Sequence, residues 1–427
     1  MMKKYLLGGM VLLAAVVIYS CSDRGSNVDP LTYDTGLVLD TYTQHAVSYL
    51  ADAPLVTNAT IKYQVYLPAG YKDYGLGEPM PVLYLLTPFR GRVQYYFNHG
   101  LTELADRMIG TGEIRPMVLF VISGYNDYGG CFFGSSRVGG DYVNALGNIV
   151  DPEDCLAGPF ATFLDYANCL INTIPDSVGY RAITGIGMGG YGAMRIAVEF
   201  PEHFSAVSAV SAPLDFDGAD NASGFLPLFQ DFMNDVGRDN YSAIQFDFNN
   251  VLQSMLLAAS VAYSPHDTGI VDDGFVITDE TSYFNDNLYD AAYHLPFYRN
   301  GQQTDTLYDT VTVDPLDVDT TIVANGGWVA WQENNIPTIL EANPTALDET
   351  AVLLAYTTDS DEYTFNEQTG DFHDLLVNTY GKVEGVDLQT ITFDGYSDYI
   401  ASGDRFIFDL LPEILKFHSD NFYLSKD

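Results

Sequence analysis

The chain has 427 residues, of which 47% are hydrophobic and 14% aromatic, so it can bury a substantial core and is not a disordered protein. It carries 57 acidic and 18 basic residues, for a formal net charge of -39 at pH 7. A field of this sign repels nucleic acid and anionic membrane surfaces, which excludes both as binding partners. The acidic clusters lack the Asp/Asn/Gly spacing of a calcium loop, so we expect no metal site and no cofactor.

The N-terminus has the pattern of an export signal. Lys3 and Lys4 form a basic start, an uncharged apolar run extends from Tyr5 to Ile18, and the small residue Ser20 then precedes Cys21. This pattern is typical of a signal peptide that ends in a lipobox. The apolar run is shorter than the roughly 20 residues that span a bilayer, which disfavours a retained transmembrane helix.

We therefore predict a lipoprotein signal peptide over residues 1–20 and a lipid on the sulfur of Cys21. Residues 21–30 are polar, contain Gly and Pro, and read as a flexible tether. The expected location is the bacterial cell envelope, at the outer membrane or cell surface, with membrane contact through the lipid alone. The folded domain is then predicted over residues 31–427.

The folded part alternates apolar, β-branched runs with helical patterns, which predicts an α/β protein with a mostly parallel central sheet flanked by helices. The expected strands are Ile61–Leu67, Val82–Leu86, Met117–Ser123, Arg181–Ile186, Ala206–Ser211, Ala351–Tyr356 and Leu388–Phe393. Helices are expected after Asn98 and over Leu164–Ile174, Tyr191–Phe200, Asn366–Tyr380 and Asp404–His418.

This alternation breaks between about residues 214 and 344, where Asp, Asn, Thr and Tyr are frequent. Loops in α/β domains are normally short, so a stretch of this length predicts an insertion that folds over the sheet as a cap. Ligands in such sheets bind at the carboxyl ends of the strands. The insertion is thus expected to form the roof of a pocket.

The segment from Arg181 to Met194 reads as a strand, a sharp turn and a helix. Its glycines match the frame G-x-S-x-G, in which a tight strand-to-helix turn holds a nucleophilic serine above the sheet. Here the serine position is Gly187. Glycine has no side-chain oxygen, so this position cannot form an acyl-enzyme.

With this elbow, several further stretches together resemble the putative-esterase family of the α/β-hydrolase superfamily, which includes S-formylglutathione hydrolases, feruloyl esterases and mycolyltransferases. The likeness runs from about Ile61 to Phe417 and is carried by Tyr66–Tyr71, Met80–Leu86, Phe132–Tyr142, the elbow through Phe204, and Ala262–Pro265. The resemblance implies an α/β-hydrolase fold with a large cap insertion and carboxylic-ester hydrolysis as the family's activity.

Transferred to this chain, the family's catalytic pattern is incomplete. The resemblance places the catalytic acid at Asp361, but it places Ser397 where the family has its histidine base. The family's oxyanion turn is altered to Thr87-Pro88, although the backbone amides near Phe89 and Met188 could still donate to an oxyanion. Nucleophile and base are thus both absent, and base-activated attack is lost with them.

The sequence indicates no other residue that would replace the missing nucleophile and base. His99, His266, His373 and His418 are each interpreted as structural, because a lone histidine is more often hydrogen-bonded in the fold than a base. The serines near the expected pocket are interpreted as turn and capping residues; they are Ser123, Ser135, Ser136, Ser211, Ser264 and Ser397.

The cysteines and aromatic residues complete the expectations. Besides Cys21 there are Cys131, Cys155 and Cys169, and one disulfide plus one buried thiol is the simplest count, with the pairing open. Aromatic residues gather around the expected pocket mouth. We interpret Trp328 and Trp331 as packing residues and leave the role of the tyrosines open.

Three functions are compatible with these features. The first is an inactive esterase homologue that binds a small-molecule or glycan ligand, or a protein partner, or serves surface structure. The second is an active carboxylic-ester hydrolase whose nucleophile has moved. The third is a subunit of a surface assembly, which the lipid anchor and the acidic, aromatic insertion would suit.

Overall fold

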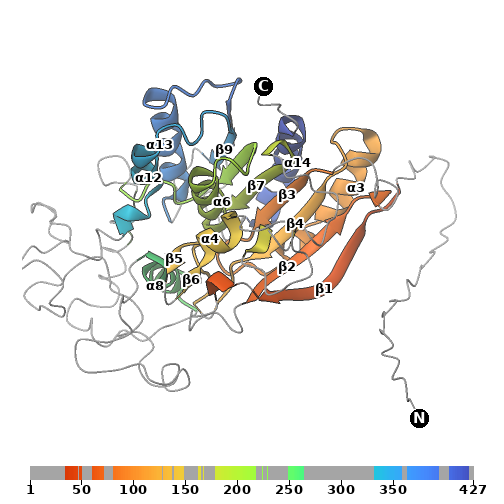
Figure 1. Ribbon diagram of the computed structural model, residues 1–427, viewed down its shortest axis with the longest axis horizontal. Coiled ribbons are helices and arrows are strands. Elements are labelled where there is room, and N and C mark those ends of the chain that lie inside the picture. The colour runs from red at the N-terminus through yellow and green to blue at the C-terminus, as the bar shows by residue number, and fades with distance from the viewer. Residues whose placement is uncertain are drawn as a thin grey trace, which may run out of the picture. The chain divides into compact units, whose positions relative to one another are not determined.

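The computed structural model describes residues 34–46, 48–50, 60–71, 80–126, 128–136, 139–148, 162–164, 167, 178–217, 224, 228, 249–263, 331–357, 363–393 and 403–422 (Figure 1). The expected signal peptide, Cys21 and the tether lie outside this part of the chain. Within it, no helix combines the length and the apolar character needed to cross a bilayer.

The core is an eight-stranded sheet in the order β1-β2-β4-β3-β7-β8-β9-β10. The strands are β1 Leu37–Ala46, β2 Thr60–Leu67, β3 Val82–Leu86, β4 Val118–Ser123, β7 Arg181–Ile186, β8 Ala206–Val210, β9 Ala351–Thr357 and β10 Leu388–Phe393. The pairs from β4 to β10 are parallel, whereas β1–β2 and β2–β4 are antiparallel. All seven expected strands are present within about one residue at each end. The mostly parallel α/β sheet is therefore confirmed.

β3, β4, β7 and β8 are buried along their whole length, which explains why their sequences are apolar on both faces. The strand that the sequence did not reveal is β1. Its run LVLDTYTQHA mixes polar and apolar residues, and it lies at the sheet edge, where an antiparallel strand needs only one apolar face.

Helices cover both faces of the sheet. On one face, α6 (Met188–Glu199) packs on β7 and β8. The same hydrophobic core is joined by α4 (Tyr142–Gly147), α8 (Val251–Tyr263), α12 (Ile336–Ala342) and α13 (Phe365–Asn378). On the other face, α3 (Leu101–Thr111) and α14 (Gly403–Asn421) pack together against the second core. Figure 1 shows α6 and α14 on opposite sides of the central strands.

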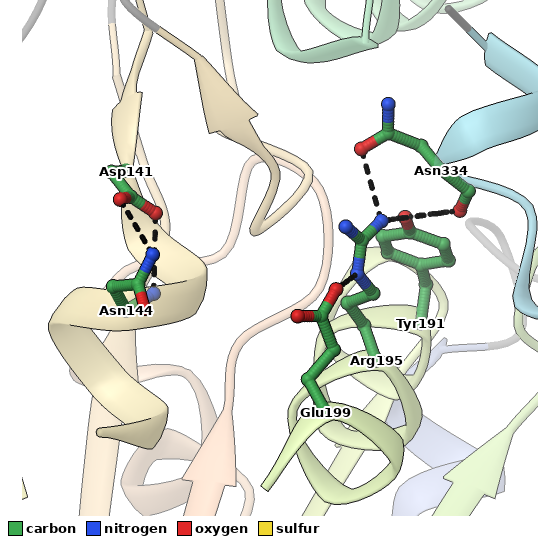
Figure 2. A network of polar contacts seen from close by, with 6 residues as sticks. All are labelled: Asp141, Asn144, Tyr191, Arg195, Glu199 and Asn334. Atoms are coloured by element: carbon green, nitrogen blue, oxygen red, sulfur yellow. Dashed lines mark hydrogen bonds and ion pairs between the residues drawn. The ribbon is translucent and has the colours of Figure 1, made fainter. Parts of the chain in front are cut away.

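The remaining elements have the following bounds: η1 Ser48–Leu50, α2 Tyr95–Asn98, β5 Ser135–Ser136, β6 Gly140–Asp141 and η3 Val178–Tyr180. α4 is capped by Asp141, whose carboxylate accepts the backbone N–H of Asn144 at 3.2 Å as an N-cap (Figure 2).

The predicted insertion between residues 214 and 344 is described only in part. It contains α8, whose side chains from Gln253 to Tyr263 are all buried, and α12. α8 is held against β5, because the Ser136 hydroxyl donates to the carbonyl of Val261 at 2.7 Å. The sequence did not reveal α8 because the helix is buried on every side and therefore lacks a clear amphipathic periodicity.

Candidate functional site

The predicted nucleophile elbow is present, with Gly187 at its tip. The chain leaves β7 at Ile186, turns at Gly187 with φ 54° and ψ −118°, and enters α6 at Met188. Only glycine adopts such backbone angles at little cost. The Gly187 N–H donates to Val210 O at 2.8 Å, and its carbonyl accepts the N–H of Tyr191 at 3.0 Å. These bonds anchor the turn to β8 and to the first turn of α6.

The neighbouring glycines are required by close packing of the backbone. A Cβ on Gly185 would overlap the backbone of Gly189 and would lie 2.7 Å from the amide nitrogen of Gly190. A Cβ on Gly189 would overlap Leu86 O and would lie 2.8 Å from Thr87 O. The frame that normally presents a serine is thus complete, although the residue that it presents has no side chain.

The predicted oxyanion turn lies directly against the elbow. The Thr87 N–H donates to Ile122 O at 3.0 Å, and the Thr87 hydroxyl accepts the N–H of Gly124 at 3.2 Å. The fully buried Thr87 side chain therefore joins the ends of β3 and β4 and does not face a ligand.

Phe89 and Met188 meet at Gly130, whose missing Cβ would overlap the Met188 sulfur and lie 2.8 Å from the Phe89 ring. In the described part of the chain, no hydrogen bond occupies the backbone N–H of Phe89 or of Met188. The two amides proposed from sequence are therefore available as donors.

The positions of the acid and the base lie outside the described residues. Asp361 comes four positions after the end of β9, and Ser397 four positions after the end of β10. β9 and β10 are parallel neighbours with Thr357 opposite Phe393, so both strands end at the sheet edge where Gly187 lies. His266, Ser264, Trp328, Cys155 and Cys169 are also outside the described residues.

Of the candidate serines that are described, Ser135 is exposed and the other three have structural partners. Ser123 donates to Gly91 O at 3.3 Å, and Ser136 holds α8. Ser211 has a positive φ of 40° and donates to Asn366 Oδ1 at 2.5 Å. That same oxygen accepts the Thr357 N–H at 3.3 Å, so Asn366 ties the end of β8 to the end of β9.

One histidine does form a hydrogen bond with a serine, and sequence reasoning missed it. Ser208 Oγ lies 2.8 Å from His418 Nε2 and 2.5 Å from Thr184 Oγ1. Both Ser208 and His418 have 0% of their surface exposed. They face the layer of α3 and α14, on the side of the sheet away from α6, where no ester can reach them.

Burial lowers the pKa of His418 to about 3, so the ring is neutral in the folded protein. Its Nδ1 has no partner among the described residues. A catalytic base would need an orienting partner there, so this pair is a buried structural contact.

The other described histidines have local roles. His99 Nδ1 lies 2.5 Å from Tyr95 O and its ring packs on that tyrosine. His373 Nδ1 lies 3.0 Å from the Asp374 carboxylate at the surface. The structural interpretation of both residues therefore stands.

Aromatic side chains connect the oxyanion turn with the end of the insertion. The ring centroids of Phe89 and Phe132 are 5.8 Å apart, those of Phe132 and Tyr263 5.9 Å, and those of Tyr263 and Trp331 5.2 Å. Trp331 is fully buried, so its packing role is confirmed.

A buried arginine joins the elbow helix to the end of the insertion. Arg195 of α6 donates to Glu199 at 2.6 Å, to the Asn334 side chain at 2.9 Å and to the Tyr191 hydroxyl at 3.1 Å (Figure 2). Tyr191 itself donates to Asn334 O at 2.7 Å. This clamp fixes residues just before α12 against the helix that starts at Gly187.

Metal and thiol chemistry receive little support in the described part of the chain. It contains no group of three His, Cys, Asp or Glu residues placed to hold a metal ion. Cys131 is a free, buried thiol, and burial raises its pKa to about 12. It fits the buried thiol of the predicted cysteine count.

Comparisons with known proteins agree with this geometry. Residues 56–223 match the model of the family described as "Putative esterase". A ferulic acid esterase structure is similar with a TM-score of 0.51 at 16% identity, covering 92% of this chain and 100% of that one.

Two further solved structures are also similar. An S-formylglutathione hydrolase from Agrobacterium tumefaciens has a TM-score of 0.44 at 14% identity, covering 92% of this chain and 97% of that one. MPT51 of Mycobacterium tuberculosis has a TM-score of 0.41 at 13% identity, covering 90% of this chain and 100% of that one. The family match and the ferulic acid esterase structure show that the chain has an esterase-type α/β-hydrolase fold and that its residues 56–223 carry the sequence pattern of the putative-esterase family.

Proposed function

We propose that this protein is an exported, lipid-anchored esterase homologue that binds a ligand without hydrolysing it. The observation that carries the proposal is Gly187 at the tip of an intact elbow, with φ 54° and ψ −118°. Nucleophilic ester hydrolysis needs an oxygen at this position and a base that removes its proton. Gly187 supplies no oxygen, and the family's base position is Ser397.

The retained parts of the site favour binding over simple loss of function. The amides of Phe89 and Met188 are available to a carbonyl or carboxylate oxygen, and the elbow frame has kept its tightly packed glycines. Phe89 and Phe132 add aromatic surface next to these donors. A small molecule or a glycan with a ring and a carbonyl group would use both features.

A relocated nucleophile is the competing explanation, and Ser208 beside His418 would be its candidate. Both side chains are fully buried in the layer opposite α6. An acyl group cannot reach Ser208 without unfolding of α14, which argues against hydrolysis through this pair.

Hydrolysis of 4-nitrophenyl acetate and butyrate by the purified protein tests the absence of turnover. We expect the rate to equal that of Gly187→Ala and of buffer with a matched concentration of an unrelated acidic protein. Saturable turnover that one substitution in the pocket abolishes would overturn the proposal.

Export and anchoring require a separate test. The wild-type protein is expected in the membrane fraction with a lipid-modified N-terminus, and Cys21→Ala is expected to lack the lipid. Mass spectrometry of the mature N-terminus distinguishes these outcomes. An unmodified Cys21 in membrane-bound protein would contradict the anchor.

A further inference from the structure

Basic side chains are scarce in this chain, with 18 in 427 residues. Several in the described part pair with a carboxylate: Arg107 with Glu113, Arg195 with Glu199, Lys382 with Asp387 and Lys416 with Asp420, at 3.0, 2.6, 3.3 and 2.7 Å. Arg90 and Arg92 differ in their location. They lie in one short turn, directly after the Thr87-Pro88-Phe89 oxyanion turn.

Arg92 presents an exposed guanidinium on an aromatic support. Its Cζ lies 4.2 Å from the ring centroid of Tyr125, a stacking arrangement that leaves the N–H groups at the guanidinium edge pointing outward. Among the residues that the structure describes, no carboxylate lies within ion-pair distance of Arg92. The positive charge of Arg92 therefore faces solvent.

The support beneath Arg92 is rigid. The Ser123 hydroxyl at the end of β4 donates to Gly91 O at 3.3 Å and accepts the N–H of Tyr125 at 3.2 Å. One serine thus fixes both the turn that carries Arg92 and the residue on which Arg92 stacks. A preorganised cation loses less entropy when it binds an anion.

Arg90 is held just as firmly. It adopts a positive φ of 64°, and its N–H donates to Gly129 O at 2.7 Å. Its Nη2 donates to Ser254 of α8 at 2.6 Å, and its Cζ lies 5.6 Å from the Phe89 ring centroid. A non-glycine residue keeps this backbone conformation only where its surroundings fix it.

The two arginines adjoin the elbow. Phe89 precedes Arg90 in the chain. The Phe89 ring and the Met188 side chain both contact Gly130, and Met188 directly follows Gly187. Two cations are thus placed where parallel strands end and where ligands of this sheet type bind. The net charge of -39 repels anions from the rest of the surface. At physiological salt, screening limits the reach of each charge to about 8 Å, so an anion close to the two arginines is attracted by them.

We infer that the ligand is anionic and carries a carboxylate or sulfate on a ring, with the anion bound at Arg92 and the ring against Tyr125 and Phe89. This inference rests on the proposed function, because it names the class of ligand for the same site. A guanidinium binds a carboxylate or sulfate through paired N–H···O bonds, and the aromatic surfaces accept either an aromatic or a sugar ring.

Calorimetric titration with two acids and their neutral methyl esters tests the inference. The acids are 4-hydroxybenzoate, an aromatic acid, and trigalacturonate, an acidic sugar. At least one acid should bind about tenfold more tightly than its own ester, as expected for a charge-assisted hydrogen bond. Which acid shows the preference distinguishes the two kinds of ring.

Two variants test whether Arg92 causes the preference for the acid over its ester. Arg92→Gln should reduce the preference for the acid at least about fivefold, whereas Lys416→Gln on α14 should leave it within about twofold. Because Arg92 is exposed, its variant should keep the wild-type melting temperature. Unchanged acid binding in Arg92→Gln, or the absence of any preference for acid over ester, would overturn the inference.

Failure of the proposed function would be seen separately. Chromatography of the titrated esters reports their hydrolysis, which would contradict the absence of turnover. That result would leave the comparison of acid binding between wild type and Arg92→Gln intact.

Discussion

Gly189 lies so close to Leu86 that a Cβ on the glycine would overlap the Leu86 carbonyl oxygen. This contact packs the first turn of α6 onto the end of β3 and onto Thr87. The chain therefore has the backbone frame of a nucleophile elbow at a position that holds glycine in place of serine.

Gly189→Ala should destabilise the protein by at least about 3 kcal/mol, because the backbone atoms that a Cβ would meet cannot move aside. Gly112→Ala is the matched control: Gly112 has φ +75°, and no atom lies within 4 Å of the point that its Cβ would occupy. It should cost only about 1 to 2 kcal/mol, for the left-handed backbone. Urea unfolding gives both values, and equal losses would contradict the packing argument.

Gly187→Ser should fold but lose about 1 to 3 kcal/mol of stability, since serine is strained at φ 54° and ψ −118°. The single variant should hydrolyse 4-nitrophenyl acetate no faster than wild type, because Ser397 cannot act as a base. Gly187→Ser with Ser397→His should restore measurable turnover. A double variant that folds and remains inactive would show that the pocket has been rebuilt around these positions.

His418 should make the protein sensitive to acid. The histidine of the unfolded chain takes up a proton near pH 6.5, whereas burial lowers the pKa in the folded state to about 3. Between these values the unfolded state binds the extra proton, so stability falls as pH drops from 6.5 towards 3, by at most about 1.4 kcal/mol per unit.

The check is the free energy of unfolding at pH 7 and pH 5. His418→Gln keeps a polar group beside Ser208 without a titrating ring, and its loss of stability between the two pH values should be smaller than that of wild type by about 2 kcal/mol. The same pH dependence in wild type and His418→Gln would contradict the assignment.

The Arg195 clamp should be energetically coupled to Asn334. Arg195→Met and Asn334→Ala should each destabilise the protein by about 1 to 3 kcal/mol, and the double variant should lose less than the sum of the two. Lys416→Gln, which removes an exposed pair with Asp420, should cost less than about 1 kcal/mol. Strict additivity in the double-mutant cycle would mean that the 2.9 Å contact contributes nothing.

The central strands could be predicted from sequence because Val82–Leu86 and Arg181–Ile186 are buried on both faces and are bounded by turn residues. Gly187 could be identified from sequence because the glycines on both sides of it belong to one short stretch of the chain, so the elbow motif can be recognised without knowledge of tertiary contacts. The contact of Ser208 with His418 joins residues 210 positions apart, and periodicity does not say what a buried helix face meets. The stacking of Arg92 on Tyr125 likewise depends on the tertiary contact between the loop after β3 and the loop after β4, which the sequence does not reveal.

Intact-mass analysis after treatment with a fluorophosphonate tests the absence of serine chemistry most directly. The native protein should remain unmodified, whereas Gly187→Ser with Ser397→His should gain one adduct, on the serine introduced at the elbow. Stoichiometric labelling of a single serine in the folded wild-type chain would contradict the account and would identify a relocated nucleophile.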